Sequence, residues 1–156
     1  MSFSKNEKIS SDIIIAADGK NSAVRKILGT NVFKKHYNEK ALVTNFYHEK
    51  PHKNIAYELF FKTGPLAILP MQKNNNNFQS ALIWSNSPQS VDMIASKDLQ
   101  RKYVTEILNE KIQQYLGRVT YINSAQTFPL SAHINEKFYH DRTVYIGDAA
   151  HSIHPI

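Results

Sequence analysis

The sequence predicts an α+β protein in which a β-rich middle with one long helix lies between two α/β-like ends. Residues 1–30 contain the apolar run DIIIAADG followed by the helix-like NSAVRKILG. The last 16 residues return to an apolar strand that is closed by Gly-Asp. Because an α/β layer is reached from both ends, we expect residues 31–140 to form a domain inserted between residues 1–30 and 141–156.

The first 30 residues predict a strand, a tight turn and a short helix. DIIIAADG is a continuous apolar run, typical of a buried strand, and Asp-Gly favours a turn. Asn21 or Ser22 is suited to cap the helix that follows, and Gly29 is suited to end it. We expect this helix to bury an apolar face formed by Val24, Ile27 and Leu28.

The middle of the chain predicts five strands and two helices. Runs rich in Ile, Val, Tyr, Phe and Thr alternate with turn chemistry, and the Asn run of QKNNNN is interpreted as a hairpin tip. Residues 96–117 carry apolar side chains at 3.6-residue spacing, with Ser96 as the cap and Gly117 as the end, and PQSVDMIA favours a shorter helix. The strand segments are ALVTNFYHE, IAYELFF, LAILP, FQSALIW and RVTYINSAQTFPL.

The composition of the 156-residue chain is that of a globular protein, with 42% hydrophobic and 21% charged residues. No apolar run approaches the ~20 residues of a membrane-spanning helix, and we expect no signal peptide. The absence of cysteine excludes disulfides and thiolate metal sites, which is consistent with a cytoplasmic protein. The net charge of +6 comes from scattered lysines without interleaved aromatics, so we expect no nucleic-acid partner.

Two short stretches carry the chemistry. In ADGKNSAVR, Asp18 and Gly19 follow a predicted strand, and Arg25 adds a cation suited to phosphate. In YIGDAAH, Asp148 stands at a strand end beside small residues that allow close approach of a ligand. Taken singly, the first stretch is better explained as a turn that caps a helix, and the second is equally weak evidence for a ligand.

As a pair, the two stretches resemble the second and third flavin-binding motifs of the FAD-dependent aromatic hydroxylases, the group-A flavoprotein monooxygenases. They are separated by about 130 residues, with a β-rich segment between them, as in that family. The segments PHKNIAYELFFKTGPLAILPM and SALIWS further resemble the ubiquinone-biosynthesis branch. The matching positions are Asp18, Gly19, Ser22, Val24 and Arg25 in the first motif, and Gly147, Asp148, Ala149, Ala150, His151 and Pro155 in the second.

The resemblance implies a monooxygenase that uses FAD, NADPH or NADH as electron donor and O₂ as co-substrate to hydroxylate an aromatic ring, here a polyprenyl phenol. It implies that Asp148 binds the ribityl chain and that Pro155 lies where flavin and substrate meet. It also implicates Asp18 and Arg25 in cofactor or nicotinamide-nucleotide handling. The implied cofactor-binding residues are Asp18, Gly19, Ser22, Arg25, Gly147, Asp148, Ala149, Ala150 and His151; the implied substrate-binding residues are Gly64, Pro65, Leu66, Leu69 and Pro70.

The sequence departs from the family pattern because it contains no Gly-x-Gly, which the family uses to bind the ADP half of FAD. We therefore expect an incomplete FAD-binding domain, in residues 1–30 and 141–156, on either side of a substrate domain. One alternative is a non-catalytic remnant or interaction module that binds no flavin; another is a second chain or oligomer that completes the site. A lipid-embedded substrate would also suit peripheral association with the inner face of a membrane.

Other residues have simpler interpretations. His151 and His154 have the spacing of a metal pair on a helix, but no third ligand stands out, so we expect no metal. Trp84 and the aromatics at 57, 60 and 61 favour core positions, His52 a loop, and Glu58 either solvent or a pocket. No Ser-His-Asp arrangement supports a hydrolase. We expect DIIIAA and TVYIG to leave apolar surface exposed and to favour oligomerisation.

Overall fold

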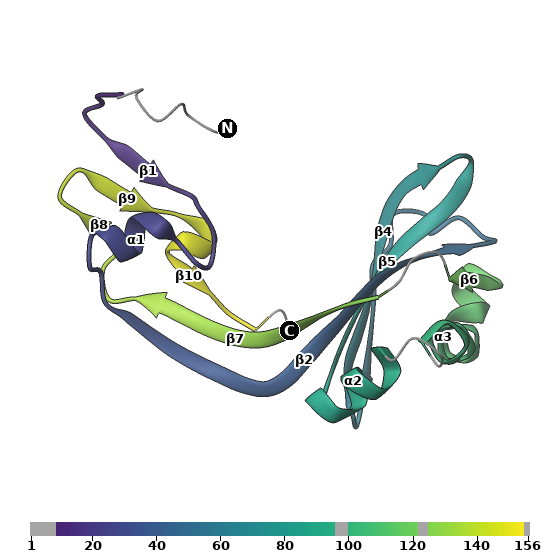
Figure 1. Ribbon diagram of the computed structural model, residues 1–156. Helices are drawn as coiled ribbons and strands as arrows, with labels where there is room; N and C mark the ends of the chain where they lie inside the picture. Colours follow the sequence, from purple (N-terminus) through teal and green to yellow (C-terminus); the bar gives the residue numbers. More distant parts are fainter. Residues whose placement is uncertain (1–8, 96–99, 122–124, 155–156) are drawn as a thin grey trace. The chain divides into compact units, whose positions relative to one another are not determined.

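The computed structural model describes residues 9–95, 100–121 and 125–154, which divide into two compact units (Figure 1). Unit 1 contains the described residues up to His36 together with those from Ser131 onward, and unit 2 contains Tyr37–Leu130. The chain passes between the units within β2 (Val32–His48) and β7 (Gln126–Asn135). The mixture of strands and helices confirms the predicted α+β class. The assignment of the two parts to flavin and substrate binding stays a prediction.

Unit 2 is built on an antiparallel sheet with the strand order β2-β5-β4-β3. These strands are β3 (Tyr57–Phe61), β4 (Gly64–Asn74) and β5 (Asn77–Asn86), all at positions expected from the sequence. A further strand, β6 (Val119–Tyr121), pairs with β2. The predicted fifth strand is therefore two strands, β6 and β7, separated by residues outside the described part.

Two helices cover one face of this sheet (Figure 1). Helix α2 (Pro88–Ala95) occupies the predicted PQSVDMIA, and the Ser87 hydroxyl caps it by accepting a hydrogen bond from the Ser90 amide at 3.3 Å. Helix α3 (Gln100–Leu116) ends at Gly117, whose φ of 73° lies in the left-handed region that favours glycine. The predicted capping residue Ser96 lies outside the described residues.

The core of unit 2 lies between this sheet face and the helices. Alternate residues of each strand face inward, so Leu42, Trp84 and Leu66 form one cross-strand row. Trp84 is 6% exposed, which confirms its predicted core position. The buried cluster consists of Leu42, Phe46, Leu66, Ile68, Leu82, Trp84, Val91, Ile94, Val104, Leu108, Ile112, Leu116 and Val119.

The sheet face away from α2 and α3 is lined by smaller side chains. Val43, Ile83 and Ala67 are aligned across the strands, and Asn45, Ala81 and Leu69 form the next row. Glu58 is exposed in register with Ala67, so its carboxylate faces solvent. Phe60 is 74% exposed, which contradicts its predicted core position; alternation along β3 places Tyr57, Leu59 and Phe61 against the core instead.

Turn chemistry sets two connections of unit 2. Asn75 and Asn76, with φ of 47° and 65°, join β4 to β5, as predicted from the Asn run. At the start of β4, Gly64 has φ of 133°, and a Cβ there would lie 2.0 Å from the Ser85 carbonyl oxygen. Glycine is therefore required at position 64 for the close approach of two backbones.

Unit 1 contains a three-stranded sheet in the order β1-β9-β8. Strand β1 (Ile14–Ala16) runs parallel to β9 (Thr143–Tyr145), which pairs antiparallel with β8 (Tyr139–His140). Helix α1 (Ala23–Ile27) follows β1, and a 3-10 turn, η1 (Gly147–Ala149), follows β9. A short strand β10 (His151–Ser152) then pairs with β7, which is also a neighbour of β2.

The apolar interior of unit 1 is small. Ala16, Tyr145 and Ala150 are buried, and Val24 and Leu28 pack against them. Ile27 is 82% exposed, so the predicted apolar face of α1 is wrong at that position. On this five-residue helix the side chain that is buried is that of Arg25.

Two further expectations for unit 1 are corrected. In β1 only Ala16 is buried, so β1 is not the buried strand that the sequence predicted. Ile14 and Ile15 are 50% and 65% exposed, which agrees with the expectation that DIIIAA leaves apolar surface exposed. The residues after Gly147 form a single 3-10 turn and then β10, where the sequence favoured the start of a helix. Hydrogen bonds from the Ala149 and Ala150 amides to Ile146 and Gly147 close this turn. No helix among the described residues is long and apolar enough to cross a membrane.

Candidate functional site

The parallel pairing of β1 and β9 brings the two predicted motifs to the same edge of a sheet. Ile14 is aligned with Thr143, and Ala16 with Tyr145, so both strands end side by side. Asp18 and Gly19 follow the end of β1, and Gly147 and Asp148 follow the end of β9. The carboxyl ends of parallel strands are where α/β sheets bind ligands.

Asp18 and Ser22 shape the first of these turns. One Asp18 carboxylate oxygen accepts hydrogen bonds from the Ala23 and Val24 amides at 2.7 and 3.1 Å. The Ser22 hydroxyl accepts from the Arg25 amide at 3.0 Å, so Ser22 is the cap, one of the two candidates from the sequence. The Ser22 hydroxyl, together with the two amides, lowers the pKa of Asp18 below its ordinary value.

Arg25 ties the first turn to the second. Its guanidinium is buried, and it donates to the Ala149 carbonyl at 3.0 Å and to the Lys20 carbonyl at 2.6 Å. A third contact joins Arg25 Nη1 to His133 Nε2 at 3.2 Å. The planar guanidinium of Arg25 therefore joins two turns of the chain, because Arg25 and Ala149 are 124 positions apart in the sequence.

Residues of strand β7 hydrogen-bond the second turn. His133 and Asn135 are alternate residues of this strand, and both are buried. The Asn135 side-chain amide donates to the Ala149 carbonyl at 3.0 Å, and its backbone amide donates to the Ala150 carbonyl at 3.0 Å. The Ala149 carbonyl thus accepts from both Arg25 and Asn135, which fixes the conformation of the turn.

A cavity of about 400 Å³ lies beside the second turn. Its lining mixes backbone and polar side chains, and the Asp148 carboxylate is exposed there. Gly147 has φ of 55°, and a Cβ at this position would meet no atom within 4 Å. The lining residues are Gly147, Asp148, His151, Ser152, Ile153 and His154.

The structure therefore places most of the predicted cofactor-binding residues in unit 1, at the ends of β1 and β9. Arg25 and Ser22 are buried and serve the geometry of the turns, whereas Asp148 and His151 are exposed at the cavity. His151 also stacks on Phe138, with 5.8 Å between ring centroids. Pro155, the predicted residue at the junction of flavin and substrate, lies outside the described residues.

The predicted substrate-binding residues lie on β4 of unit 2. Leu66 has no exposed surface and belongs to the core, so its side chain is not available to a ligand. Leu69 is 38% exposed on the face away from the helices. Gly64 and Pro65 line a separate cavity of about 530 Å³ with Asn86 and Ser87. The segment is thus divided between core, sheet face and cavity.

His151 and His154 lie close together in the sequence near the second turn. His151 lies in β10 and His154 follows it, so they do not share a helix face. Within the described ranges, no three His, Asp or Glu side chains are grouped to hold a metal ion. In unit 2, His52 is a loop residue, as predicted, and its ring hydrogen-bonds the Met71 carbonyl at 3.0 Å.

Sequence reasoning missed the supporting residues. The sequence assigned no supporting role to His133, Asn135 or Lys20, and Lys20 donates to the Ser131 carbonyl at 2.8 Å. The only signal was the alternation of polar side chains in SAHIN, where the period of a strand places His133 and Asn135 on one side.

The residues present fit a flavin nucleotide in part. The exposed Asp148 carboxylate is a suitable acceptor for sugar-like hydroxyls, and Gly147 leaves the backbone open to close approach. Within the described part of the chain, Asn135 Oδ1 is buried beside the turn without a hydrogen-bond partner, an acceptor that this fold leaves unsatisfied. Sugar hydroxyls, which FAD carries, are donors of the kind these acceptors need.

Two turns at the ends of parallel strands are held together by a buried arginine, at the edge of the sheet where α/β proteins bind ligands. The family of FAD binding domains matches residues 2–156, and the chain belongs to this family. This confirms the resemblance found in the sequence and FAD as the cofactor of the family.

The chain is similar in sequence to several curated proteins named as ubiquinone hydroxylases. The chain is 28% identical over 154 residues to ubiquinone hydroxylase UbiL of Rhodospirillum rubrum, covering 99% of this chain and 34% of the relative. It is 28% identical to the 3-demethoxyubiquinol 3-hydroxylase of Escherichia coli, covering 96% and 37%. The chain therefore spans about a third of the length of these relatives.

Solved structures share the fold. PqsL, a probable FAD-dependent monooxygenase from Pseudomonas aeruginosa, superposes with a TM-score of 0.69 at 17% identity, over 92% of this chain and 40% of that one. Aklavinone-11 hydroxylase, solved with FAD and aklavinone, gives 0.59 at 18% identity, over 92% and 26%. At these identities the likeness concerns the fold alone.

Proposed function

We propose that this chain contributes part of the FAD site of a monooxygenase that hydroxylates a polyprenyl phenol in ubiquinone biosynthesis. The observation that carries the proposal is the Arg25–Ala149 hydrogen bond, since it holds together two turns at the carboxyl ends of β1 and β9. The names of the relatives, which are ubiquinone hydroxylases, support the substrate class. NADPH or NADH would supply electrons and O₂ the oxygen.

Each residue of the site has a task in this proposal. FAD, when bound, supplies the redox and oxygen-transfer chemistry. The Asp148 carboxylate accepts from the ribityl hydroxyls, and the open backbone at Gly147 allows the cofactor to approach. Arg25 fixes the Ala149 carbonyl and so sets the direction of the amides that follow Asp148. Asp18 and Ser22 hold the first turn in place.

Flavin retention tests the proposal. The purified chain is mixed with FAD and passed through a gel-filtration column, and the visible spectrum of the protein peak is recorded. We expect flavin bands in that peak, and a Kd about tenfold higher or more for Asp148→Asn, because hydrogen bonds to a charged acceptor contribute about 1.5–3 kcal/mol. Asp12→Asn is the matched control, because Asp12 is exposed and precedes the start of β1, whereas the site lies at the end of this strand.

A cooperatively folded chain that retains no flavin would contradict FAD binding by this chain and favour an interaction module. Equal affinity of Asp148→Asn and the unchanged chain would contradict the role of Asp148 while leaving flavin binding intact.

The substrate surface in this proposal is the sheet face of unit 2 away from α2 and α3. It carries Ala67, Ala81, Ile83 and Leu69, small and aliphatic side chains that suit a flat aromatic ring. Titrating a phenol that bears one or two isoprene units should shift the methyl NMR signals of these residues. The buried Leu108 methyls, on the other side of the core, are the internal control.

Exposed residues around β3 support contact with a membrane surface. Ile55 and Phe60 are 47% and 74% exposed, and Lys53 and Lys62 are exposed nearby in the sequence. The chain should therefore sediment with vesicles containing anionic lipid, and Phe60→Asp should reduce this. Equal sedimentation of both proteins would contradict the proposed contact.

The exposed isoleucines of β1 support association with a second chain or copy. Light scattering of the purified chain is expected to show a species larger than 17.9 kDa. A monodisperse monomer would contradict this expectation.

A further inference from the structure

His133 is a buried histidine that the flavin motifs do not use. It is 5% exposed in β7 and belongs to neither the Asp18–Arg25 turn nor the Gly147–Ala150 turn. Its ring nevertheless contacts Arg25 directly, with Nε2 3.2 Å from Arg25 Nη1. The same Nη1 atom donates to the Ala149 carbonyl of the second turn at 3.0 Å, so His133 is linked to both turns through Arg25.

Hydrogen-bond chemistry fixes the state of this imidazole. A guanidinium has only donors, so His133 Nε2 must present its lone pair to Arg25. The proton of the neutral ring is then on Nδ1. A protonated ring would place an N–H group against the guanidinium N–H, and two like charges would be in contact.

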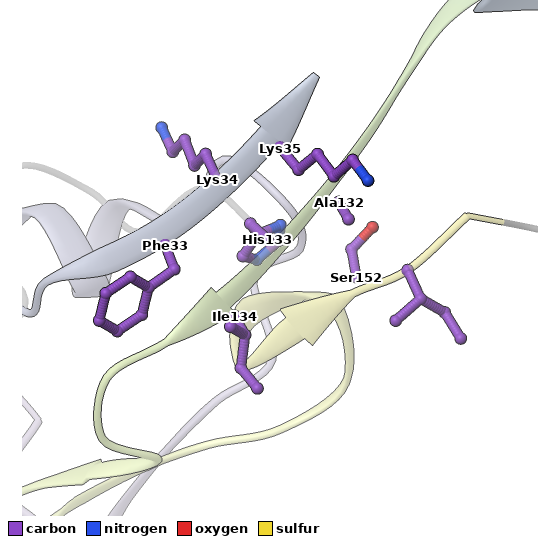
Figure 2. A pocket seen from close by; sticks show the side chains of 8 residues that line it. Phe33, Lys34, Lys35, Ala132, His133, Ile134 and Ser152 are labelled. Atoms are coloured by element: carbon purple, nitrogen blue, oxygen red, sulfur yellow. The ribbon is translucent and has the colours of Figure 1, made fainter. Parts of the chain in front are cut away.

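The charged groups around His133 come from several elements. Arg25 is on α1, Lys20 precedes that helix, and Asp148 is in η1. On the neighbouring strands, Ser152 of β10 is in register with His133, and Lys34 and Lys35 of β2 line the same pocket (Figure 2). Cations outnumber the single carboxylate, so the surroundings oppose a charged imidazole.

We propose that His133 is a positioning residue that, as a neutral imidazole, holds Arg25 against the Gly147–Ala150 turn, and that protonating it weakens this restraint. The proposal deepens the proposed function, because the turn is the one assigned there to FAD. Asn135 supports the same turn through hydrogen bonds that do not titrate. The pH-dependent part of the restraint on the turn is therefore assigned to His133.

The direction of the pH effect follows from the pKa. Burial lowers the pKa of His133 below 6.5, and the Arg25 guanidinium adds to this effect. A lowered pKa in the folded state means that the contribution to stability is complete above pH 6.5 and is lost as the pH falls through the folded-state pKa. The turn should loosen on the acidic side, with a loss of flavin affinity of up to about tenfold per unit of pKa difference.

Imidazole NMR of the ¹⁵N-labelled chain tests the proposal without flavin. We expect His133 to be the Nδ1–H tautomer at pH 7.5, and the amide signals of Gly147, Ala149 and Ala150 to shift with its titration. An Nε2–H tautomer, or turn signals that do not follow His133, would overturn the proposal.

Variants provide the second measurement. His133→Gln keeps an acceptor for Arg25 but does not titrate, so it should keep the turn signals of pH 7.5 down to pH 5.5. His140→Gln is the matched control, because His140 is exposed in the same unit, and it should retain the pH dependence of the unchanged chain. If His133→Gln titrates like the unchanged chain, His133 does not position the turn.

Flavin binding is measured separately. Affinity that falls on acidification in the unchanged chain but stays constant in His133→Gln is expected. If no protein binds FAD at any pH, the proposed function fails, while the tautomer and the turn signals still decide the role of His133.

Discussion

In unit 2 the interior is one large apolar cluster of strand and helix residues, whereas in unit 1 a cluster of three buried apolar residues, Ala16, Tyr145 and Ala150, accompanies the buried polar residues Arg25, His133 and Asn135. The first kind of interior depends on volume, because its contacts are non-directional. The second depends on the positions of donors and acceptors, because each buried polar group needs a partner. Unit 1, which has the smaller apolar interior, carries the candidate cofactor site. A binding site requires backbone amides and carbonyls in fixed orientations, and directional hydrogen bonds supply these.

The largest expected effect is in the core of unit 2. Leu108 has no exposed surface, so Leu108→Ala should lower the free energy of unfolding by about 2–5 kcal/mol through lost burial and a residual cavity. Urea denaturation measures this loss. Ile27→Ala is the control on an exposed position of α1 and should change stability by less than about 0.5 kcal/mol. Equal losses in the two variants would contradict the assignment of Leu108 to an apolar core that determines the stability of unit 2.

The second effect is in the hydrogen-bonded interior of unit 1. Arg25→Met keeps much of the side-chain volume but removes the donors to the Ala149 and Lys20 carbonyls, so we expect a loss of about 1–3 kcal/mol. Arg25→Lys keeps the charge without the planar fork and should restore only part of the loss. Urea denaturation measures the stability of both variants, and the NMR signal of the Ala149 amide reports the conformation of the turn in each. The neighbouring Lys26→Met should be silent, because Lys26 is exposed.

The third effect is the pH dependence of unit 2, where His48 is the counterpart of His133. Burial lowers the pKa of His48, whose ring bonds to the Lys50 carbonyl at 2.8 Å and the Ser80 hydroxyl at 3.0 Å. Its contribution to stability is therefore complete above pH 6.5 and decreases as the pH falls through the lowered pKa. Urea denaturation at several pH values should show a smaller acid loss for His48→Gln than for the unchanged chain. An identical loss would contradict the assignment.

The smallest effect concerns a surface ion pair. Lys40 and Asp92 are in contact at 2.7 Å, and the Asp92 side chain is 55% exposed. Asp92→Asn should cost about 0.2–1 kcal/mol, because solvent screens exposed pairs. A double-mutant cycle with Lys40→Met isolates the coupling, which should decrease further in high salt.

The elements set by local chemistry could be predicted from the sequence. Helix α2 occupies the expected residues, Asn75 and Asn76 make the expected turn, and Gly29 and Gly117 follow the ends of their helices with positive φ. In each case the deciding interaction lies within a few residues along the chain. The family could be recognised for a similar reason, since its motifs are contiguous.

Features set by long-range contacts could not be predicted. Nothing local to VRKILG indicates that Arg25 is buried and Ile27 exposed, because the acceptors of Arg25 are the Ala149 carbonyl and His133. The long β2 was missed over residues 32–40, where no apolar alternation marks a strand. The short η1 was taken for a helix start because the small residues after Gly147 suit either conformation.

The carbonyl of Ala149 has a spectroscopic consequence. The Ala149 carbonyl oxygen accepts hydrogen bonds from both Arg25 and Asn135, which weakens its C=O bond. We therefore expect its amide I absorption at a lower frequency than that of a carbonyl that accepts one hydrogen bond. A ¹³C=O label at Ala149 would therefore report in the infrared whether both donors are in place. The infrared frequency of this one carbonyl would thus report whether the two turns are held together.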